Sequence, residues 1–596
     1  MWIIFSYNNG LKMLEYSFFY LFFLKIRNRS LYIRYKRTCN TKFYTIMNIM
    51  VQNTQTDNGA VAYEWDTNAK TNTCELFNMA RGASEQDIVS RCLAIWQHDM
   101  DLFVALMFYM RDIRKNPTVV QVESADFKAI PKGKGEKLLA YWMALWLLNM
   151  DEVVFARNFT RFVRDIGYFK DCLIMAKMAL SLKYADTKIM MILMPLASAL
   201  VEDEDKILKA HMNKQPREKL RLSLASKWAP RQGKSYSMLI PYMKTLCGIT
   251  GSKSDAKWRK YIQSIVRATT TDTVETLLST KNYDKIEFKT VPSKAFNLYK
   301  NAFARTPELA DRFTAFIQRV RSGDASIHVG AIHPHEILTP YLGSVACCRL
   351  GIDLLEIQSE DPVTEAQWKC YIDAAKKSSM SLDRDDTTFI PMIDVSDSMF
   401  DTKALSIKAA LTLGITLSQI NTGIFERKAI TFSTKPLMMD ITGTTAIAQI
   451  SSIFDEFRKP ENADVSMYST DFVKAFECLL EFCLENNVPA DKVAKIKVIA
   501  LSDMEFDQAD SVLGVSTSPL QAIREKFAER GYQAPQIIYW NLNGHMSHTP
   551  CMFDDTGVAM LGGFEPSIIE AFLETGVLDP SAIPFQILNT YKQLVC

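Results

Sequence analysis

Asp394, Ser396 and Ser398 stand at the end of an apolar run, residues 389–393, that is typical of a buried strand. One carboxylate and two hydroxyls spaced two residues apart can converge on a single hard cation, because Mg²⁺ prefers oxygen ligands in octahedral geometry. Mg²⁺ also keeps some of its waters, so a site with few protein oxygens leaves a coordination position open for a partner. The alternative is structural, since Ser396, Asp397 and Ser398 could equally cap the helix that follows.

Two later elements could bring further oxygen ligands to the same place. Thr470 and Asp471 open a helical pattern over residues 472–484, and a strand over residues 495–501 runs into Asp503. Open α/β sheets bind ligands at the carboxyl edge, where both strands would end. Here the chain resembles the von Willebrand factor A domain, whose metal-ion-dependent adhesion site uses Asp-x-Ser-x-Ser, a later Thr and a later Asp. The resemblance implies an Mg²⁺ or Mn²⁺ site formed by Asp394, Ser396, Ser398, Thr470 and Asp503.

Strand and helix patterns alternate from about residue 385 to the end of the sequence. Such alternation predicts a Rossmann-like α/β fold, with a mostly parallel sheet covered on both faces. The expected strands are residues 388–393, 428–432, 495–501, 536–542 and 557–561. The expected helices are residues 402–418, 444–457, 471–484, 519–530 and 566–574.

The preceding region, from about residue 86 to residue 375, has apolar residues at helical spacing. Successive helices joined by short turns predict a bundle or a HEAT-like solenoid, although no clean repeat period is visible. The Met-rich and Trp-rich run at 141–150 is predicted to be core. The polar stretch at 376–386 marks the boundary between a helical domain, 75–384, and an α/β domain, 385–596. Residues 1–74 form a separate N-terminal extension. The main helical runs are 88–110, 138–163, 172–182 and 189–201.

Length and composition are typical of an intracellular globular protein with several domains. The chain has 596 residues and a net charge of +2, which indicates no particular class of partner. Its twelve cysteines include no Cys-x-x-Cys pair, a pattern that favours reduced thiols over a disulfide framework. These observations predict a cytoplasmic protein.

Residues 1–46 differ in composition from the rest of the chain. The uncharged run at 16–24 is too short to span a bilayer as a helix, and basic residues follow it rather than precede it. The segment is either a peripheral membrane anchor or an upstream extension that is not part of the functional protein. We favour the second interpretation, with Met47 or Met50 as the true start, and expect no stable membrane span.

The segment at 214–234 contains seven Lys or Arg residues against one Glu, and a second basic stretch at 253–267 includes Trp258 and Tyr261. Basic side chains with exposed aromatic rings suit single-stranded nucleic acid, because cations contact phosphates and flat rings stack on bases. The alternative is a solvated helix face whose side-chain stems cover apolar surface. The candidate RNA-binding residues are Lys214, Arg217, Lys219, Arg221, Lys227, Trp228, Arg231 and Lys234.

Five short motifs carry a wider resemblance: RDIGYFKD at 164–171, KWAP at 227–230, IHPHEI at 332–337, LSDMEFD at 501–507 and IYWN at 538–541. Together they resemble an uncharacterised family found in plants, fungi and giant viruses. That family is similar in layout to the Ro-type (TROVE) RNA-binding proteins, in which a ring of helical repeats precedes a von Willebrand A domain. The resemblance implies binding of structured or misfolded RNA without catalysis.

These observations together predict a non-catalytic binding protein. Its helical domain would contact RNA or a protein partner, and its A domain would capture a protein partner that donates a carboxylate to the metal. One alternative is a hydrolase or transferase that holds two metals with Asp394, Asp503, Glu505 and Asp507. Another is a pure scaffold, such as a virion component. The His545, His548 and Cys551 set lacks a fourth zinc ligand, and His333-Pro334-His335 is expected to be a helix start.

Overall fold

The computed structural model places a succession of helices before a six-stranded sheet, which confirms the predicted order of an α-helical part and an α/β part. Residues 1–51, the boundary at 380–387 and the expected helix at 566–574 lie outside the residues that it describes. Among the described helices, none is both long and apolar enough to cross a bilayer. The described residues are 52–55, 61–64, 68–79, 83–112, 133–214, 220–269, 273–329, 332–342, 359–379, 388–399, 405–432, 435–457, 459, 471–504, 518–543, 550–551, 555–564 and 582–596.

The α-helical part follows a hairpin in which β1 (Gln52–Gln55) pairs antiparallel with β2 (Val61–Glu64). The Met-rich and Trp-rich run at 141–150 lies in α6 and is largely buried, which confirms its prediction as core. The helices are α3 (Ala69–Asn78), α4 (Glu85–His98), α5 (Met100–Arg111), α6 (Lys137–Met150), α7 (Glu152–Arg161), α8 (Lys170–Ser181), α9 (Asp186–Met212), α10 (Ala225–Trp228), α11 (Ile240–Leu246), α12 (Ser254–Thr269), α13 (Val274–Ser279), α14 (Ser293–Arg305), α15 (Pro307–Ser322), α16 (Pro334–Ile337), α17 (Thr339–Leu342) and α18 (Pro362–Ser379).

Single aspartates divide the longest apolar runs into pairs of helices. Asp99 ends α4 and also caps α5, since its carboxylate accepts a hydrogen bond from the Leu102 N–H at 2.9 Å. Asp151 stands in the same way between α6 and α7 and accepts from the Val153 and Val154 N–H groups. An N-cap aspartate satisfies N–H groups that have no partner within the helix. The apolar period continues across these caps, so the pattern alone does not reveal them.

The α/β part contains a sheet of order β5-β4-β3-β6-β7-β8, in which only the edge strand β5 is antiparallel to its neighbour. The five expected strands are present, whereas β5 was not predicted. The elements are β3 (Phe389–Asp394), α19 (Leu405–Ser418), β4 (Lys428–Phe432), β5 (Leu437–Asp440), α20 (Ala446–Phe457), α21 (Phe472–Glu485), α22 (Ala490–Val493), β6 (Lys497–Ser502), α23 (Pro519–Glu529), β7 (Gln536–Asn541), β8 (Val558–Gly562) and α25 (Ala582–Tyr591).

Alternate residues of β3 enter two separate cores, one on each face of the sheet. Ile393 packs in the core that contains residues of α19 and α20, and Met392 packs in the core that contains residues of α21 and α23. On α19, Gly414 lies so close to β3 that an added Cβ would come 2.4 Å from the Ile393 Cδ1 atom. The sheet is therefore covered on both faces, as the alternating pattern predicts.

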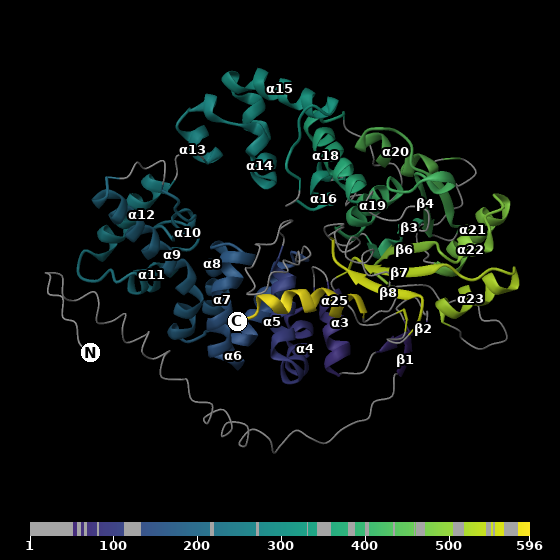
Figure 1. The fold of residues 1–596 in the computed structure, drawn as a ribbon, viewed down its shortest axis with the longest axis horizontal. Helices are drawn as coiled ribbons and strands as arrows, with labels where there is room; N and C mark the ends of the chain where they lie inside the picture. The colour runs from purple at the N-terminus through teal and green to yellow at the C-terminus, as the bar shows by residue number, and fades with distance from the viewer. Residues whose placement is uncertain are drawn as a thin grey trace, which may run out of the picture.

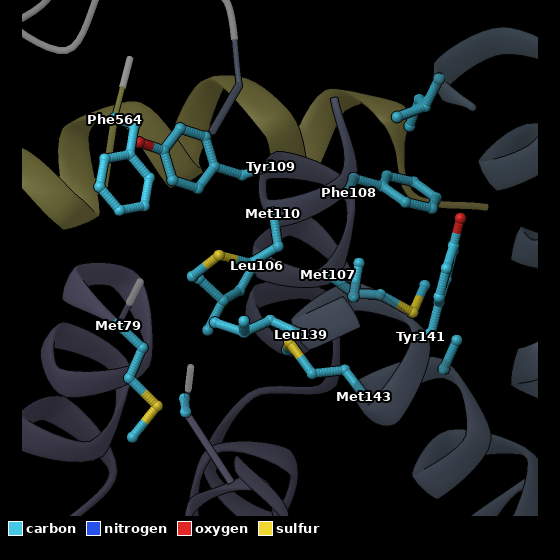
Figure 2. Packing of buried hydrophobic residues seen from close by; sticks show 14 of the residues in the cluster. Met79, Leu106, Met107, Phe108, Tyr109, Met110, Leu139, Tyr141, Met143 and Phe564 are labelled. Atoms are coloured by element: carbon cyan, nitrogen blue, oxygen red, sulfur yellow. The ribbon is translucent and has the colours of Figure 1, made fainter. Parts of the chain in front are cut away.

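The helical part meets the α/β part at both of its ends and forms a closed arc (Figure 1). At the start of the arc α3 packs on β8, and at its end α16 packs on α19 and α18 on α20. Phe564, which follows β8, belongs to the same buried cluster as Met79 and Tyr109 (Figure 2). Its ring centroid is also 5.3 Å from that of His335, which lies in α16. His333 is the N-cap residue of that helix, so its prediction as a helix start is confirmed.

The last helix, α25, returns from the α/β part and packs on α5. The Tyr591 hydroxyl donates a hydrogen bond to the Asp112 carboxylate at 2.9 Å, and Tyr591 is fully buried. Next to it, the Lys592 ammonium donates to the Asp99 carboxylate at 2.6 Å. These contacts join residues at opposite ends of the chain and fix the arc in its closed form.

Candidate metal centre and basic surface

The ends of β3 and β6 lie side by side at the centre of the sheet, where Ile393 pairs with Leu501. After β3 the chain continues to β4 on one side, and it later returns to β6 on the other side. This reversal is a topological switch point, the place where open α/β sheets leave a crevice for ligands. Asp394 ends β3 and Asp503 directly follows β6, so both acids stand at this point.

Asp394 is fully buried, and its two carboxylate oxygens are held by neighbouring groups. Oδ1 accepts a hydrogen bond from the Ser396 N–H at 2.9 Å, and Oδ2 accepts from the Ser502 hydroxyl at 2.5 Å. Ser502 is itself positioned, since its oxygen accepts from the Met504 N–H at 3.0 Å. Ser502 is not among the predicted ligands, although its position between a predicted strand and Asp503 is a signal that could have identified it.

Two buried carboxylates repel each other at this switch point. Asp503 is only 5% exposed. Burial, and then the nearby charge of Asp503, raise the pKa of Asp394 from an ordinary 3.8 to about 7. Within the part of the chain that the structure describes, Asp394 forms no ion pair. Two like charges therefore lie together, and none of the described residues supplies a counter-charge to Asp394.

The hydroxyls of Ser396 and Ser398 lie 3.0 Å apart beside Asp394. Ser398 lies in a 3₁₀ turn, η8 (Asp397–Met399), and Ser396 directly precedes this turn. Because α19 begins only at Leu405, neither serine caps that helix. Met504 has a φ of 72°, in the left-handed region that non-glycine residues rarely adopt. Such backbone strain is characteristic of functional sites, and here it directly follows Asp503.

Several predicted ligands lie outside the described residues. They are Thr470, the fifth residue of the predicted metal site; Glu505 and Asp507, which the two-metal alternative needs; and His545 and His548. Cys551 is buried, and burial raises the pKa of its thiol well above 9.0. Among the described residues, no group of three or more His, Cys, Asp or Glu side chains is placed to hold a metal. The candidate centre thus consists of Asp394, Ser396, Ser398 and Asp503.

The described residues of the predicted basic segment, 214 and 220–234, lie mostly outside helices, because α10 is only four residues long. Trp228 is half-buried, and Arg217 and Lys219 lie outside the described residues. The second basic stretch differs from expectation, since Trp258 is only 2% exposed and its indole N–H donates to the Pro230 carbonyl at 3.0 Å. Trp258 is a core residue of α12, not an exposed ring. The exposed basic residues of the segment are Lys214, Arg221, Lys227, Arg231 and Lys234.

A more compact group of rings and cations forms around Trp228. The ring centroids of Trp228 and Tyr168 are 5.6 Å apart in an edge-to-face arrangement. The Lys170 and Lys227 ammonium groups lie 5.3 and 5.9 Å from the Trp228 ring, and Lys137 lies 5.3 Å from the Tyr168 ring. All five side chains are at least partly exposed. We call this group, which comes from three separate segments, the aromatic–lysine cluster.

A buried ion pair positions Tyr168 within this cluster. The Arg111 guanidinium donates to both oxygens of Asp171, at 2.8 and 3.1 Å, and the Tyr141 hydroxyl donates to the same carboxylate at 2.6 Å. The Tyr168 N–H donates to Asp171 as well, at 3.1 Å. Gly167 leaves the necessary room, because a Cβ there would come 2.2 Å from the Asp171 carboxylate. The motif at 164–171 therefore supports Tyr168, whose side chain is only partly exposed, from beneath.

Two family models match the chain, and neither assigns it a function. Residues 388–591 match a "Domain of unknown function (DUF7788)", and residues 191–380 match a "Domain of unknown function (DUF2828)". The chain is also similar to Uncharacterized protein L728 of Acanthamoeba polyphaga mimivirus, at 25% identity over 566 residues, which cover 90% of this chain and 87% of the viral protein. The predicted likeness to a family with giant-virus members agrees with this relative. The von Willebrand A and TROVE likenesses stay predictions.

Proposed function

We propose that this chain is a binding protein whose α/β part holds Mg²⁺ or Mn²⁺ at Asp394, Ser396, Ser398 and Asp503 and captures a carboxylate of a protein partner. One observation carries the proposal: two buried, mutually repelling carboxylates stand beside two hydroxyls at the switch point of the sheet. A divalent cation is the simplest group that removes this repulsion. The resemblance to von Willebrand A domains supports the same site and would add Thr470.

The donor set fits a hard cation. All four side chains offer oxygen, and none offers the sulfur or imidazole nitrogen that softer metals select. A bound Mg²⁺ would supply positive charge and an open coordination position for an anionic oxygen. The protein's own part is positional, since Ser502 and the Ser396 N–H hold the Asp394 carboxylate in place. Because Ser398 is exposed, the four candidate ligands are open to solvent at this residue.

The same residues favour binding over catalysis. A two-metal phosphoryl-transfer centre needs carboxylates that bridge ions about 4 Å apart, and each added ion needs added negative charge. Ser396 and Ser398 contribute hydroxyls, which neutralise no charge. The enzyme alternative rests on Glu505 and Asp507, which lie outside the described residues. We therefore propose no reaction for this site.

Calorimetric titration of the full chain with MgCl₂ and MnCl₂ tests the metal site. We expect a single site that Asp394→Ala abolishes and Asp503→Asn weakens, whereas Asp491→Asn, an exposed acid of the same part, leaves it unchanged. Water-proton relaxation of the Mn²⁺ form then tests the open position, because a glutamate-containing peptide should displace metal-bound water. Unchanged metal affinity in Asp394→Ala would reject the assignment.

A second candidate function is RNA binding at the aromatic–lysine cluster. The observation that favours it is the combination of two partly exposed rings with three lysines, supported from beneath by the Arg111–Asp171 pair. Lysines would contact phosphates, and Tyr168 and Trp228 would offer ring edges or faces to bases. The layout of a closed helical arc joined to an α/β part agrees with the TROVE resemblance. A protein with a giant-virus relative would act in the cytoplasm or within a virion.

Salt-dependent binding of single-stranded RNA tests this candidate. Replacing Lys137, Lys170 and Lys227 with Ser should weaken binding and flatten the logarithmic salt dependence by about 0.7 for each phosphate that the protein no longer neutralises. Lys428→Ser is a matched control, because its ammonium also lies over a ring, that of Phe482, but in the α/β part. If replacing Lys214 and Arg221 has the larger effect, the exposed loop and not the cluster is the binding surface.

A further inference from the structure

Helices α13, α14 and α15 bury a hydrophobic core of their own, and we call residues 274–322 the α13–α15 unit (Figure 1). In this core the ring centroid of Phe313 lies 5.3 Å from that of Phe288 and 5.9 Å from that of Phe296. The preceding helices bury their apolar residues in a different cluster, which extends to Ile265 of α12. Among the described helices, none from α3 to α12 packs closely on α13, α14 or α15. The core of the arc is therefore interrupted at the joint between α12 and α13.

On its other side the α13–α15 unit is firmly attached to α18. Ala366 of α18 belongs to the hydrophobic core of the unit. The Gln367 amide donates a hydrogen bond to the Asn297 side chain at 2.6 Å. The Lys300 ammonium lies 3.1 Å from the Asp361 carboxylate, just before α18. Apolar and polar contacts together therefore hold the unit to α18.

An ion pair spans the joint between α12 and α13. The Lys227 ammonium, in α10, lies 2.9 Å from the carboxylate of Glu275, which stands in the first turn of α13. Both side chains are 37% exposed, and ion pairs at such positions are weak. Lys227 also belongs to the aromatic–lysine cluster, where its ammonium lies 5.9 Å from the Trp228 ring. One ammonium group therefore serves both the joint and the candidate RNA site.

We propose that the Lys227–Glu275 ion pair is a latch, which RNA releases when it binds the aromatic–lysine cluster. This inference rests on the RNA binding proposed for that cluster. A phosphate that contacts the Lys227 ammonium brings a second negative charge beside the Glu275 carboxylate, and these like charges repel each other. The phosphate and Glu275 therefore compete for Lys227. When Glu275 is displaced, the α13–α15 unit turns about its contacts with α18 and the arc opens at the joint.

Cross-linking of the full chain with a carbodiimide tests the competition. The reagent joins the Lys227 amine to the Glu275 carboxylate as an amide and takes up the released water as a urea, and mass spectrometry measures the yield. Single-stranded RNA with a 5′ hydroxyl end should lower this yield in proportion to the fraction of protein that is bound. The control is the cross-link between Lys300 and Asp361, on the side attached to α18, which RNA should leave unchanged.

Distances between two spin labels on the full chain test the opening of the joint. The labels are carried by non-canonical amino acids, which leave the native cysteines unmodified, at the exposed positions Gln263 of α12 and Asn301 of α14. Glu275→Gln should widen the distance distribution without RNA, and RNA should widen it in the otherwise unchanged chain. Labels at Asn301 and at the exposed Lys377 of α18 should keep their distance in both cases.

The same variant also changes the affinity for RNA, because it frees Lys227. Glu275→Gln should raise this affinity by up to about five-fold, the equivalent of one exposed ion pair. Glu287→Gln removes an exposed acid elsewhere in the unit and should change the affinity less. If no RNA binds, the proposed RNA binding and its release of the latch fail together. If RNA binds but the Lys227–Glu275 cross-link persists, or if the distance is unchanged in Glu275→Gln, the latch alone is refuted.

Discussion

Replacing Asp394 with Asn should stabilise the metal-free protein, although it removes a residue that a metal would need. Asn can keep both hydrogen bonds of the carboxylate, since its oxygen can accept from the Ser396 N–H and its amide can donate to Ser502. What it removes is a buried negative charge next to Asp503. The pKa of Asp394 rises from 3.8 to about 7 in the folded chain. At about 1.4 kcal/mol for each pKa unit, the charge disfavours folding by about 4 kcal/mol at pH 8.

The sign of the pH dependence follows from the same shift. Between pH 3.8 and about 7 the folded chain holds a proton on Asp394 that the unfolded chain has lost. The contribution of Asp394 to the metal-free stability therefore falls as pH rises through this window, and Asp394→Asn should lack that fall. Mg²⁺ at about 100 times its dissociation constant should restore about 2.7 kcal/mol to the wild type and nothing to the variant.

Urea unfolding at pH 8, with EDTA or with Mg²⁺, measures both effects. The exposed Asp491→Asn serves as the control and should follow the wild type under both conditions. Suppose instead that metal-free Asp394→Asn is less stable than the wild type and that Mg²⁺ stabilises neither protein. The carboxylate would then be a structural acceptor for Ser396 and Ser502, and the reasoning from charge repulsion would be refuted.

Three further changes test how the arc is closed and held. Gly562→Ala should lower the free energy of unfolding by more than about 3 kcal/mol, because its Cβ would come 1.6 Å from the Asn78 carbonyl oxygen; calorimetric melting measures this. Tyr591→Phe should cost about 1–3 kcal/mol in urea unfolding, because buried Asp112 loses a donor. Burial lowers the pKa of Lys134 from 10.5 to about 7, so its contribution to stability should rise between about pH 7 and pH 10.5, and Lys134→Met should flatten that rise in urea unfolding.

The α/β part is the region where sequence periods translate best into structure. The five expected strands occur within one or two residues of their predicted limits because each is an apolar run bounded by turns. The edge strand β5 escapes such reasoning, since its four residues pair on one side only and include exposed Asp440. Helix α25 was not predicted for another reason. Its apolar side chains pack against α5, which lies hundreds of residues earlier in the chain.

In the candidate sites, too, residues that are close in the sequence could be predicted, and residues that meet only in the folded chain could not. Asp394, Ser396 and Ser398 could be found because their spacing is local, and Asp503 because it follows a strand. The aromatic–lysine cluster could not, since Tyr168 and Trp228 meet only after folding. The number of basic residues predicted a binding surface at a loop and at Trp258, but Trp258 is buried in the folded chain. The number of charges along a segment does not indicate which aromatic ring faces solvent.

A buried polar group has a structural role when other groups of the folded chain satisfy it. It is a candidate binding site when the described residues leave it unsatisfied. The carboxylate of Asp171 is fully buried, yet it is neutralised by Arg111 and accepts from Tyr141, so it needs nothing from outside. Asp394 is equally buried but faces a like charge. Folding there costs free energy that the contacts among the described residues do not return. A cation at the carboxyl edge of the sheet would supply the missing partner, which is why we assign a binding role to Asp394 and a scaffolding role to Asp171.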